Sequence, residues 1–236
     1  MLLAMADVQH SAATPSDIVL DEMRVRETLV TIFDCVLPAA PDVEYRFGGT
    51  ASVLFRGIAL PAGDIDFLLQ QRRDVDLFSR GVSALSSTRC LMPPTWLPDD
   101  SQYFARYVVD NVVVEFTTVE LQEELETDTF ECVGRGPWEH FDLISCGPYR
   151  VPTVALELRL LSELRRNRPE RYRPILETLR RQRCDVALVR RGFVARSIPE
   201  ALQRETLKYI EPAPSSSDLL SPTPVPVVPC LANPAS

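Results

Sequence analysis

Lysine is almost missing from this chain of 236 residues, which carries a single lysine, Lys208, among 25 basic residues. Histidine is limited to two residues, and the six cysteines lie far apart with no C-x-x-C pair. Metal sites built from cysteine and histidine need close spacing, so neither a zinc site nor a disulfide framework is indicated. Scattered cysteines of this kind are typical of reduced thiols, and we expect a cytoplasmic protein.

Long apolar runs are missing too. A membrane helix needs about 18 or more consecutive apolar residues, and no segment of the chain approaches that length. The first six residues lack the basic flank of a secretion signal and are followed by Asp7. With 45% hydrophobic and 25% charged residues, the composition is that of a globular protein. We therefore expect a soluble protein without a membrane partner, whose oligomeric state the sequence does not reveal.

Positive charge is in deficit overall, because 33 acidic residues outnumber 25 basic ones and leave a net charge of −8. A protein that coats nucleic acid would need broad phosphate neutralisation, so this class is disfavoured. The charge is unevenly distributed. Residues 1–158 have a balance of −14, whereas residues 159–204 hold 13 arginines against 5 acids. An acidic body is thus joined to a basic segment.

Composition and periodicity divide the chain into four parts. Residues 1–15 are predicted to be a flexible leader, 16–151 an α/β core, 152–210 a helical Arg-rich segment and 211–236 a Pro-rich disordered tail. The elements expected in the core are a helix capped by Ser16 or Asp17 and ending near Val36, strands at 43–47, 64–69, 103–109, 112–117, 141–145 and 149–151, helices at 50–56 and 74–85, and a proline-broken stretch around 93–98. Further helices are expected at 154–166, 170–182, 185–190 and 199–210.

Paired glycines end the first predicted strand, in the run Gly48-Gly49-Thr50. Glycine has no Cβ, so a ligand can approach the backbone closely at this point. The helix that follows directs its positive N-terminal end to the same place. This arrangement is typical of a site that binds a triphosphate.

Two carboxylates interrupt the next predicted strand. Side chains alternate across a strand, so Asp64 and Asp66 lie on one face, about 7 Å apart at their Cα atoms. Oxygen ligands of this kind suit magnesium. Glu115 is an acid in another strand that is otherwise apolar, and it is the best candidate for a third ligand in a two-metal site.

The run Phe47-Gly48-Gly49, a spacer of residues 50–63, and then Asp64-Ile65-Asp66-Phe67 resembles the signature of the nucleotidyltransferase superfamily related to DNA polymerase β. With Phe55-Arg56-Gly57 included, the pattern looks most like small bacterial members akin to AbiEii-type toxins and antibiotic adenylyltransferases. The resemblance is specific over residues 43–69 and extends to residue 117. It implies an α+β fold, with a mixed sheet flanked by helices and a C-terminal helical segment. It also implies magnesium, a nucleoside triphosphate (NTP) as substrate, and transfer of a nucleoside monophosphate to an acceptor hydroxyl.

The resemblance assigns roles to particular residues. Asp64, Asp66 and Glu115 would be catalytic and bind metal, and the nucleotide would be bound by Gly48, Gly49, Thr50 and Arg56. Two departures stand out. Leu60-Pro61-Ala62-Gly63 replaces a basic-polar pair of many relatives, and their C-terminal lysine pattern is missing, so that an arginine would have to take its place: Arg165, Arg168 or Arg171.

Simpler interpretations stand beside these. The glycines could form an ordinary turn and the aspartates a solvated strand end. Glu115 could lie on an edge strand facing water, and Arg56 on the helix surface. His140 is expected in a loop and Glu157 on a solvated helix face, and the Arg-rich helices are expected to be solvated, with pairs such as Arg166 and Glu170.

Three functions follow as hypotheses. The first is a magnesium-dependent nucleotidyltransferase whose acceptor is a small molecule, a protein hydroxyl or a tRNA end. The second is a catalytically degenerate protein of the same fold, acting as a binding or regulatory module and related to toxin–antitoxin systems. The third is an interaction protein with an accidental motif, which requires Gly48 and Asp64 to lie far apart.

Overall fold

The computed structural model of the protein describes residues 19–98, 102–119 and 127–211. The predicted leader, residues 1–15, lies outside the described residues, as does all but the first residue of the predicted tail. No helix within the described ranges is long and apolar enough to cross a membrane.

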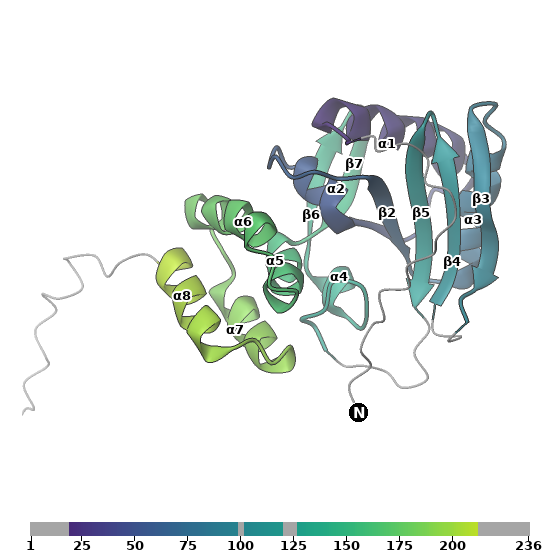
Figure 1. The fold of residues 1–236 in the computed structure, drawn as a ribbon. Coiled ribbons are helices and arrows are strands. Elements are labelled where there is room, and N and C mark those ends of the chain that lie inside the picture. Colours follow the sequence, from purple (N-terminus) through teal and green to yellow (C-terminus); the bar gives the residue numbers. More distant parts are fainter. Residues whose placement is uncertain (1–18, 99–101, 120–126, 212–236) are drawn as a thin grey trace, which may run out of the picture.

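A seven-stranded mixed sheet forms the centre of the molecule, in the order β3-β4-β5-β2-β1-β7-β6 (Figure 1). Strand β2 runs parallel to β5 and antiparallel to β1, which is in turn parallel to β7. The strands are β1 (Tyr45–Gly48), β2 (Asp64–Leu69), β3 (Thr88–Trp96), β4 (Gln102–Val109), β5 (Val112–Val119), β6 (Phe141–Cys146) and β7 (Tyr149–Val154).

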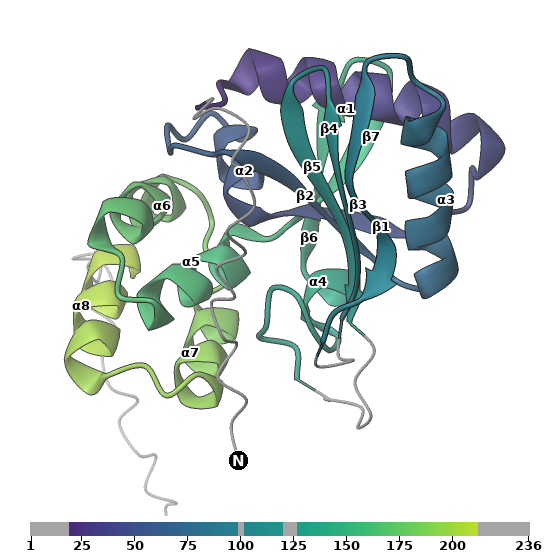
Figure 2. The same ribbon diagram turned by 45° about the vertical axis from the view of Figure 1, so that its right-hand side comes forward.

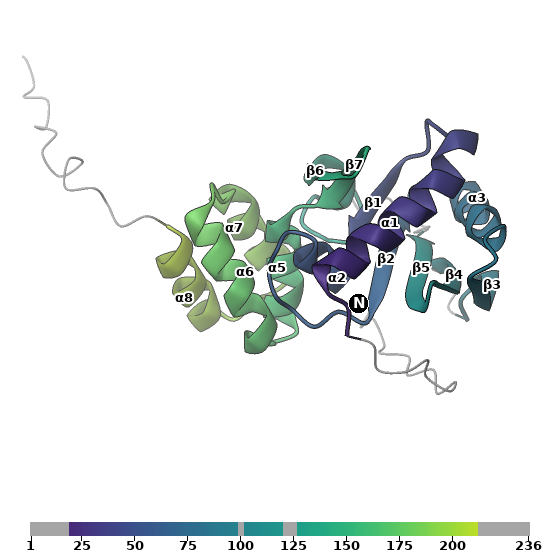
Figure 3. The ribbon, with the colours of Figure 1, turned by 90° about the horizontal axis from the view of Figure 1, so that it is seen from above.

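Helices cover the sheet on one face and extend beyond it at one end (Figure 3). They are α1 (Glu22–Val36), α2 (Gly49–Leu54), α3 (Arg72–Ser83), α4 (Gly136–Glu139), α5 (Leu156–Arg165), α6 (Pro169–Arg181), α7 (Val186–Ala195) and α8 (Glu200–Ile210), with a short 3-10 helix at Leu37–Ala39. The α+β class, a mixed sheet flanked by helices with a helical C-terminal segment, is confirmed.

The main hydrophobic core lies between the sheet and the apolar faces of α1 and α3. Strand alternation explains how it forms: Ile65 and Phe67 of β2 are fully buried in this core, so Asp64 and Asp66 must lie on the other face of the sheet. Aromatic rings surround Phe67, which meets Phe33 of α1 edge to face at a centroid distance of 5.9 Å.

A second core holds the C-terminal helices together beside the sheet (Figure 2). Leucines of α5 pack against α6 and α7, which α8 contacts in turn, and Val53 of α2 joins the same core. Because α2 directly follows the Gly48-Gly49 turn, this contact places α5 and α6 next to that turn.

Most of the predicted elements are present, with shifted ends. Strand 64–69 has the predicted bounds, and the predicted hairpin turn at Asp110-Asn111 joins β4 to β5 with positive φ at both residues. The predicted start of the first helix was wrong: α1 begins at Glu22, and Asp21 is its N-cap because its carboxylate accepts a hydrogen bond from the Arg24 amide.

Strand β3 was not predicted, because Pro93 and Pro94 break the pattern. It lies at the edge of the sheet and pairs with β4 only. Proline removes a backbone donor, and an edge strand tolerates this loss on its open side. The register with β4 shifts twice, between Cys90 and Met92 and between Met92 and Thr95.

Candidate active site

Strand register brings the predicted site residues into one row. Gly48 at the end of β1 lies opposite Asp66 of β2, and Asp66 lies opposite Glu115 of β5. Asp64 lies on the same face of β2, two residues away. The requirement of the third hypothesis, that Gly48 and Asp64 lie far apart, is therefore not met.

The three carboxylates converge. One oxygen from each of Asp64, Asp66 and Glu115 lies within 4.8 Å of the other two. Glu115 does not lie on an edge strand facing water, as the simpler interpretation held: β5 lies between β2 and β4, and the Glu115 side chain is 20% exposed.

Gly49 fits closely against this cluster. Its φ of +66° lies in the left-handed region that favours glycine. A Cβ at this position would lie 1.7 Å from Asp66 Oδ2, a distance at which no two such atoms can coexist. The chain therefore needs glycine here both for the backbone turn and for room beside the Asp66 carboxylate.

Burial and mutual repulsion disturb the ionisation of the cluster. Desolvation, followed by the charges of Asp64 and Glu115, raises the pKa of Asp66 well above its ordinary value. Desolvation and then the charge of Asp64 raise the pKa of Glu115 to about 7, although Arg106 acts in the opposite direction. Carboxylates that are held close together despite desolvation and mutual repulsion form a favourable binding site for a divalent cation.

Arg106 of β4 is a neighbour of the cluster that the sequence did not single out. It lies opposite Glu115 in the β4–β5 register, and its Nε is 3.0 Å from Glu115 Oε1. Gly48, Asp66, Glu115 and Arg106 thus follow one another across β1, β2, β5 and β4, and Arg106 places a cation at the β4 end of this row.

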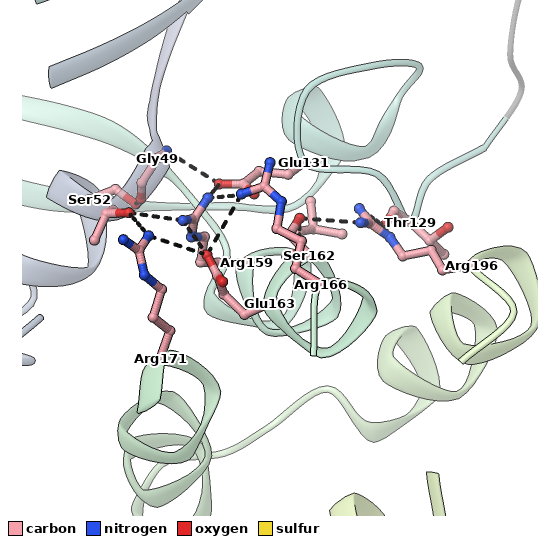
Figure 4. Close-up of polar contacts among 12 residues, drawn as sticks. Gly49, Ser52, Thr129, Glu131, Arg159, Ser162, Glu163, Arg166, Arg171 and Arg196 are labelled. Carbon is pink, nitrogen blue, oxygen red and sulfur yellow. Dashed lines mark hydrogen bonds and ion pairs between the residues drawn. The ribbon is translucent and has the colours of Figure 1, made fainter. Parts of the chain in front are cut away.

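More arginines meet the glycine turn from the other side (Figure 4). Thr50 accepts hydrogen bonds at its Oγ1 from Arg159 Nη2 of α5, at 2.9 Å, and from Arg171 Nη1 of α6, at 3.0 Å. Of the arginines proposed to replace the missing lysine, Arg171 thus contacts a residue of the turn. Arg165 ends α5 and is exposed, and Arg168 is the N-cap of α6.

Two glutamates that the sequence reasoning missed neutralise Arg159. Its Nη1 donates to Glu131 at 3.1 and 3.2 Å, and its Nη2 donates to Glu163. The side chains of Arg159, Glu131 and Glu163 are 8%, 5% and 0% exposed. The spacing of Arg159 and Glu163, four residues apart on an expected helix, could have indicated their ion pair. Glu131 lies in an irregular segment, and no local pattern pointed to it.

Glu131 reaches the glycine turn itself. The Gly49 amide donates to Glu131 Oε1 at 3.3 Å. Burial raises the pKa of Glu131, but the charge of Arg159, a hydrogen bond from Ser162 and the charge of Arg196 outweigh it, so that the pKa lies below its ordinary value. A buried, ionised carboxylate therefore accepts the hydrogen bond of the Gly49 amide, which the sequence analysis expected to bind a phosphate.

Arg56, predicted to bind nucleotide, makes other contacts. Its guanidinium donates to Asp142 Oδ2 and to the Val154 carbonyl, both at 2.8 Å, and to the Thr153 carbonyl at 3.2 Å. These bonds tie the end of α2 to the β6–β7 hairpin. Arg56 thus helps to hold the fold together and does not have the free surface position of the simpler interpretation, while its contact with a nucleotide stays a prediction.

Two further expectations were wrong. Glu157 is buried and accepts a hydrogen bond from the Asp185 amide at 2.9 Å, so it does not lie on a solvated face. Arg166 pairs with Glu163 at 3.9 Å instead of with Glu170. The two errors have different causes: nearly all of α5 is buried, which includes Glu157, whereas Arg166 and Glu170 do not share a helix because α5 ends at Arg165 and α6 begins at Pro169.

A second group of possible metal ligands occurs among the described residues, formed by Asp128, Glu139 and His140. His140 directly precedes β6. Arg191 already pairs with Asp128 at 2.6 Å and Arg135 with Glu139 at 3.2 Å. Both carboxylates of this group thus pair with an arginine, whereas among the described residues the Asp64 cluster has such an ion pair at Glu115 only.

Comparison with known proteins gives structural neighbours alone. No protein-family model matches the chain, and no curated protein matches it significantly. Among solved structures, a candidate nucleotidyltransferase from Thermotoga maritima aligns with a TM-score of 0.48 at 15% identity, covering 70% of this chain and 98% of its own. The antibiotic-resistance factor ANT(2'')-Ia aligns with a TM-score of 0.47 at 13% identity, covering 79% and 98%.

A candidate nucleotidyltransferase from Helicobacter pylori aligns with a TM-score of 0.39 at 13% identity, covering 78% of this chain and 92% of its own. Because every one of these TM-scores is below 0.5, the function proposed below rests on the geometry of the site.

Proposed function

We propose that this protein is a magnesium-dependent nucleotidyltransferase that moves a nucleoside monophosphate from an NTP to an acceptor hydroxyl. One observation carries the proposal: three carboxylates from two adjacent strands lie within 4.8 Å of one another, directly beside a glycine turn that leaves no room for a Cβ. A structural role does not require such mutual repulsion between acids, whereas a bound cation would relieve it.

The donor set fits magnesium. Asp64, Asp66 and Glu115 offer oxygen atoms, which this ion prefers. The pKa values of Asp66 and Glu115 are raised even though Arg159 lowers that of Asp66 and Arg106 lowers that of Glu115. These three residues would hold the metal in this proposal. When bound, magnesium would neutralise the triphosphate and activate the acceptor hydroxyl.

The phosphates would lie over the glycine turn. Gly48 and Gly49 allow close approach to the backbone, Thr50 offers a hydroxyl, and Arg159 and Arg171 already converge on that hydroxyl. Guanidinium groups bind phosphate in bidentate geometry, so two arginines can serve where related proteins use lysine. The acceptor stays open between a small molecule, a protein hydroxyl and a tRNA end.

A second function has an observation of its own. Glu131 and Glu163 neutralise Arg159, and Glu131 holds the Gly49 amide. If Arg159 and the Gly49 amide are permanently bonded to these internal acids, the protein would be a catalytically degenerate module that binds or regulates a partner, as in a toxin–antitoxin pair. This alternative predicts that Asp64→Ala combined with Asp66→Ala leaves cellular function intact.

Calorimetric titration separates the two functions. ATP, GTP, CTP and UTP are titrated with magnesium into the wild type, the Asp64→Asn variant with Asp66→Asn, and a control variant at the exposed Glu44, Glu44→Gln. An enzyme should bind at least one NTP with the wild type and the control, and bind it much more weakly with the double variant. No binding to any NTP by folded wild type would reject the enzymatic proposal.

The acceptor needs a separate experiment. Cell extract is incubated with the protein and a radiolabelled form of the NTP that binds, and the labelled products are separated by electrophoresis and chromatography. Label that depends on Asp64 and Asp66 identifies the acceptor as RNA, protein or a small molecule.

A further inference from the structure

The charge balance around Arg159 raises a question about the phosphate side of the site. Arg159, Arg166 and Arg171 all lie within 4 Å of Glu163, and Arg159 also contacts Glu131 (Figure 4). The cations that a triphosphate would need are therefore already engaged by carboxylates. Glu131 alone among these acids also accepts a bond from the Gly49 amide.

Glu131 has the chemistry of a phosphate at this place. Its carboxylate is an anion, it accepts from a backbone amide at a glycine turn, and it accepts from the Arg159 guanidinium. These are the donors that bind phosphate oxygens in proteins. Gly48 contributes to the same space, because a Cβ there would lie 4.0 Å from Glu131 Oε1.

The polar network around Glu131 is incompletely bonded. Arg159 Nε and Glu163 Oε2 are buried, and neither has a hydrogen-bond partner in the described part of the chain. Glu163 is fully buried, and Figure 4 shows its carboxyl directed toward Arg159 and Arg171, on the side of the glycine turn. Buried polar atoms normally find partners, and a phosphate oxygen could accept from Arg159 Nε, whereas Glu163 Oε2 is itself an acceptor and needs a donor.

The backbone of the Glu131 segment has an anchor of its own. The Thr129 carbonyl accepts two hydrogen bonds from Arg196 at 2.9 and 3.1 Å, and Arg191 holds Asp128. The segment is thus held independently of the Glu131 carboxylate, so that moving this carboxylate away from Gly49 would require rotation of the side chain alone.

We propose that Glu131 is an internal competitor of the substrate: its carboxylate occupies the position of a phosphate at Gly49 and Arg159, and NTP binding displaces it. This inference rests on the proposed nucleotidyltransferase function and adds regulation to it. Arg159 exchanges one anion for another during displacement, so its charge stays balanced in both states. In the free protein, Glu131 therefore competes with phosphate for Gly49 and Arg159, and only a ligand with enough negative charge displaces it.

The test measures affinity for magnesium with inorganic tripolyphosphate, and with ATP, by calorimetry. Glu131→Gln removes the competing charge at almost unchanged volume, and the affinity is expected to rise about 10- to 100-fold, as for loss of one charge-assisted competitor. Glu131→Asp, which keeps the charge but withdraws it by one methylene, should also bind more tightly, and it serves if Glu131→Gln does not fold.

Two controls separate occupancy from general electrostatics. Glu139→Gln removes an exposed charge from the neighbouring helix α4 and should change affinity by less than twofold. Glu163→Gln removes a buried charge from Arg159, although Glu163 makes no contact with Gly49, and it should raise affinity less than Glu131→Gln does.

Each outcome decides between the two claims. If the wild type binds and Glu131→Gln binds equally or more weakly, or gains no more than Glu163→Gln, the competitor role is overturned while the proposed function stands. If neither the wild type nor any folded Glu131 variant binds tripolyphosphate or ATP, the proposed function fails and the competitor role fails with it. Binding by Glu131→Gln alone would support both.

Discussion

Replacing Gly49 by alanine tests the geometry of the candidate site without assuming any activity. The new Cβ would lie 1.7 Å from Asp66 Oδ2 and 2.6 Å from Asp66 Cγ, so the carboxylate must move away. Overpacking of this kind costs about 1–3 kcal/mol. Alanine at a φ of +66° adds about 1–2 kcal/mol of backbone strain. We expect Gly49→Ala to lower the free energy of unfolding by about 2–5 kcal/mol.

A double-mutant cycle with Asp66→Ala isolates the steric term. In that background the Asp66 carboxyl oxygen is gone, so Gly49→Ala should cost only the backbone strain of about 1–2 kcal/mol. The coupling energy between the two positions is then about 1–3 kcal/mol. Asp66→Ala by itself should be neutral or slightly stabilising in metal-free buffer, because burial and the charges of Asp64 and Glu115 disfavour the ionised form of Asp66.

The assay is urea denaturation of the wild type, both single variants and the double variant, with a chelator present. Gly63→Ala is the matched control, since no atom lies within 4 Å of a Cβ at Gly63, and it should change stability by less than about 0.5 kcal/mol. Additivity within about 0.5 kcal/mol between Gly49→Ala and Asp66→Ala would refute the close contact, and with it the architecture of the site.

Four further predictions concern charged residues. Glu115 has a pKa raised from 4.5 to about 7, so its contribution to stability is complete below pH 4.5 and is lost as the pH rises through 7. In metal-free buffer, the free energy of unfolding of the wild type relative to Glu115→Gln should therefore fall by up to about 3 kcal/mol over this range. Magnesium should raise the melting temperature of the wild type at pH 8 but hardly at pH 5, and an equal rise at both would count against the site. Arg159→Ala removes the guanidinium that bonds to both buried carboxylates, Glu131 and Glu163, and should cost about 3–5 kcal/mol in urea denaturation, against less than about 0.5 kcal/mol for Arg173→Ala on the surface of α6. Arg56→Ala should cost about 2–3 kcal/mol through its lost buried hydrogen bonds, and calorimetry should find tripolyphosphate affinity within twofold of wild type; a much weaker affinity would restore Arg56 as a ligand contact.

Local sequence pattern was sufficient to predict the strand that carries the two aspartates, the glycine turn before it and the hairpin at Asp110-Asn111. The apolar alternation around Asp64 and Asp66 has a period of two, and this period by itself decides that both carboxylates share a face. Glycines followed by a helix, and Asp110-Asn111 between two β-rich runs, are signals confined to a few residues each. The prolines of β3 hid a strand, since their effect depends on whether a strand lies at the edge of a sheet, which a sequence pattern does not show.

The amino-acid sequence by itself determined the α+β class, the order of glycine turn and paired aspartates, and the choice of Glu115 as the third acid. Only the tertiary structure decided that Arg159 and Arg171 meet at Thr50, that Arg56 is used for internal bonds, and that Glu131 holds the Gly49 amide. The physical reason is distance along the chain: Gly49 and Glu131 are 82 residues apart, and Thr50 and Arg171 are 121 apart. Periodicity reports which face of an element is buried, whereas the partner of a buried charge depends on how separate elements pack together.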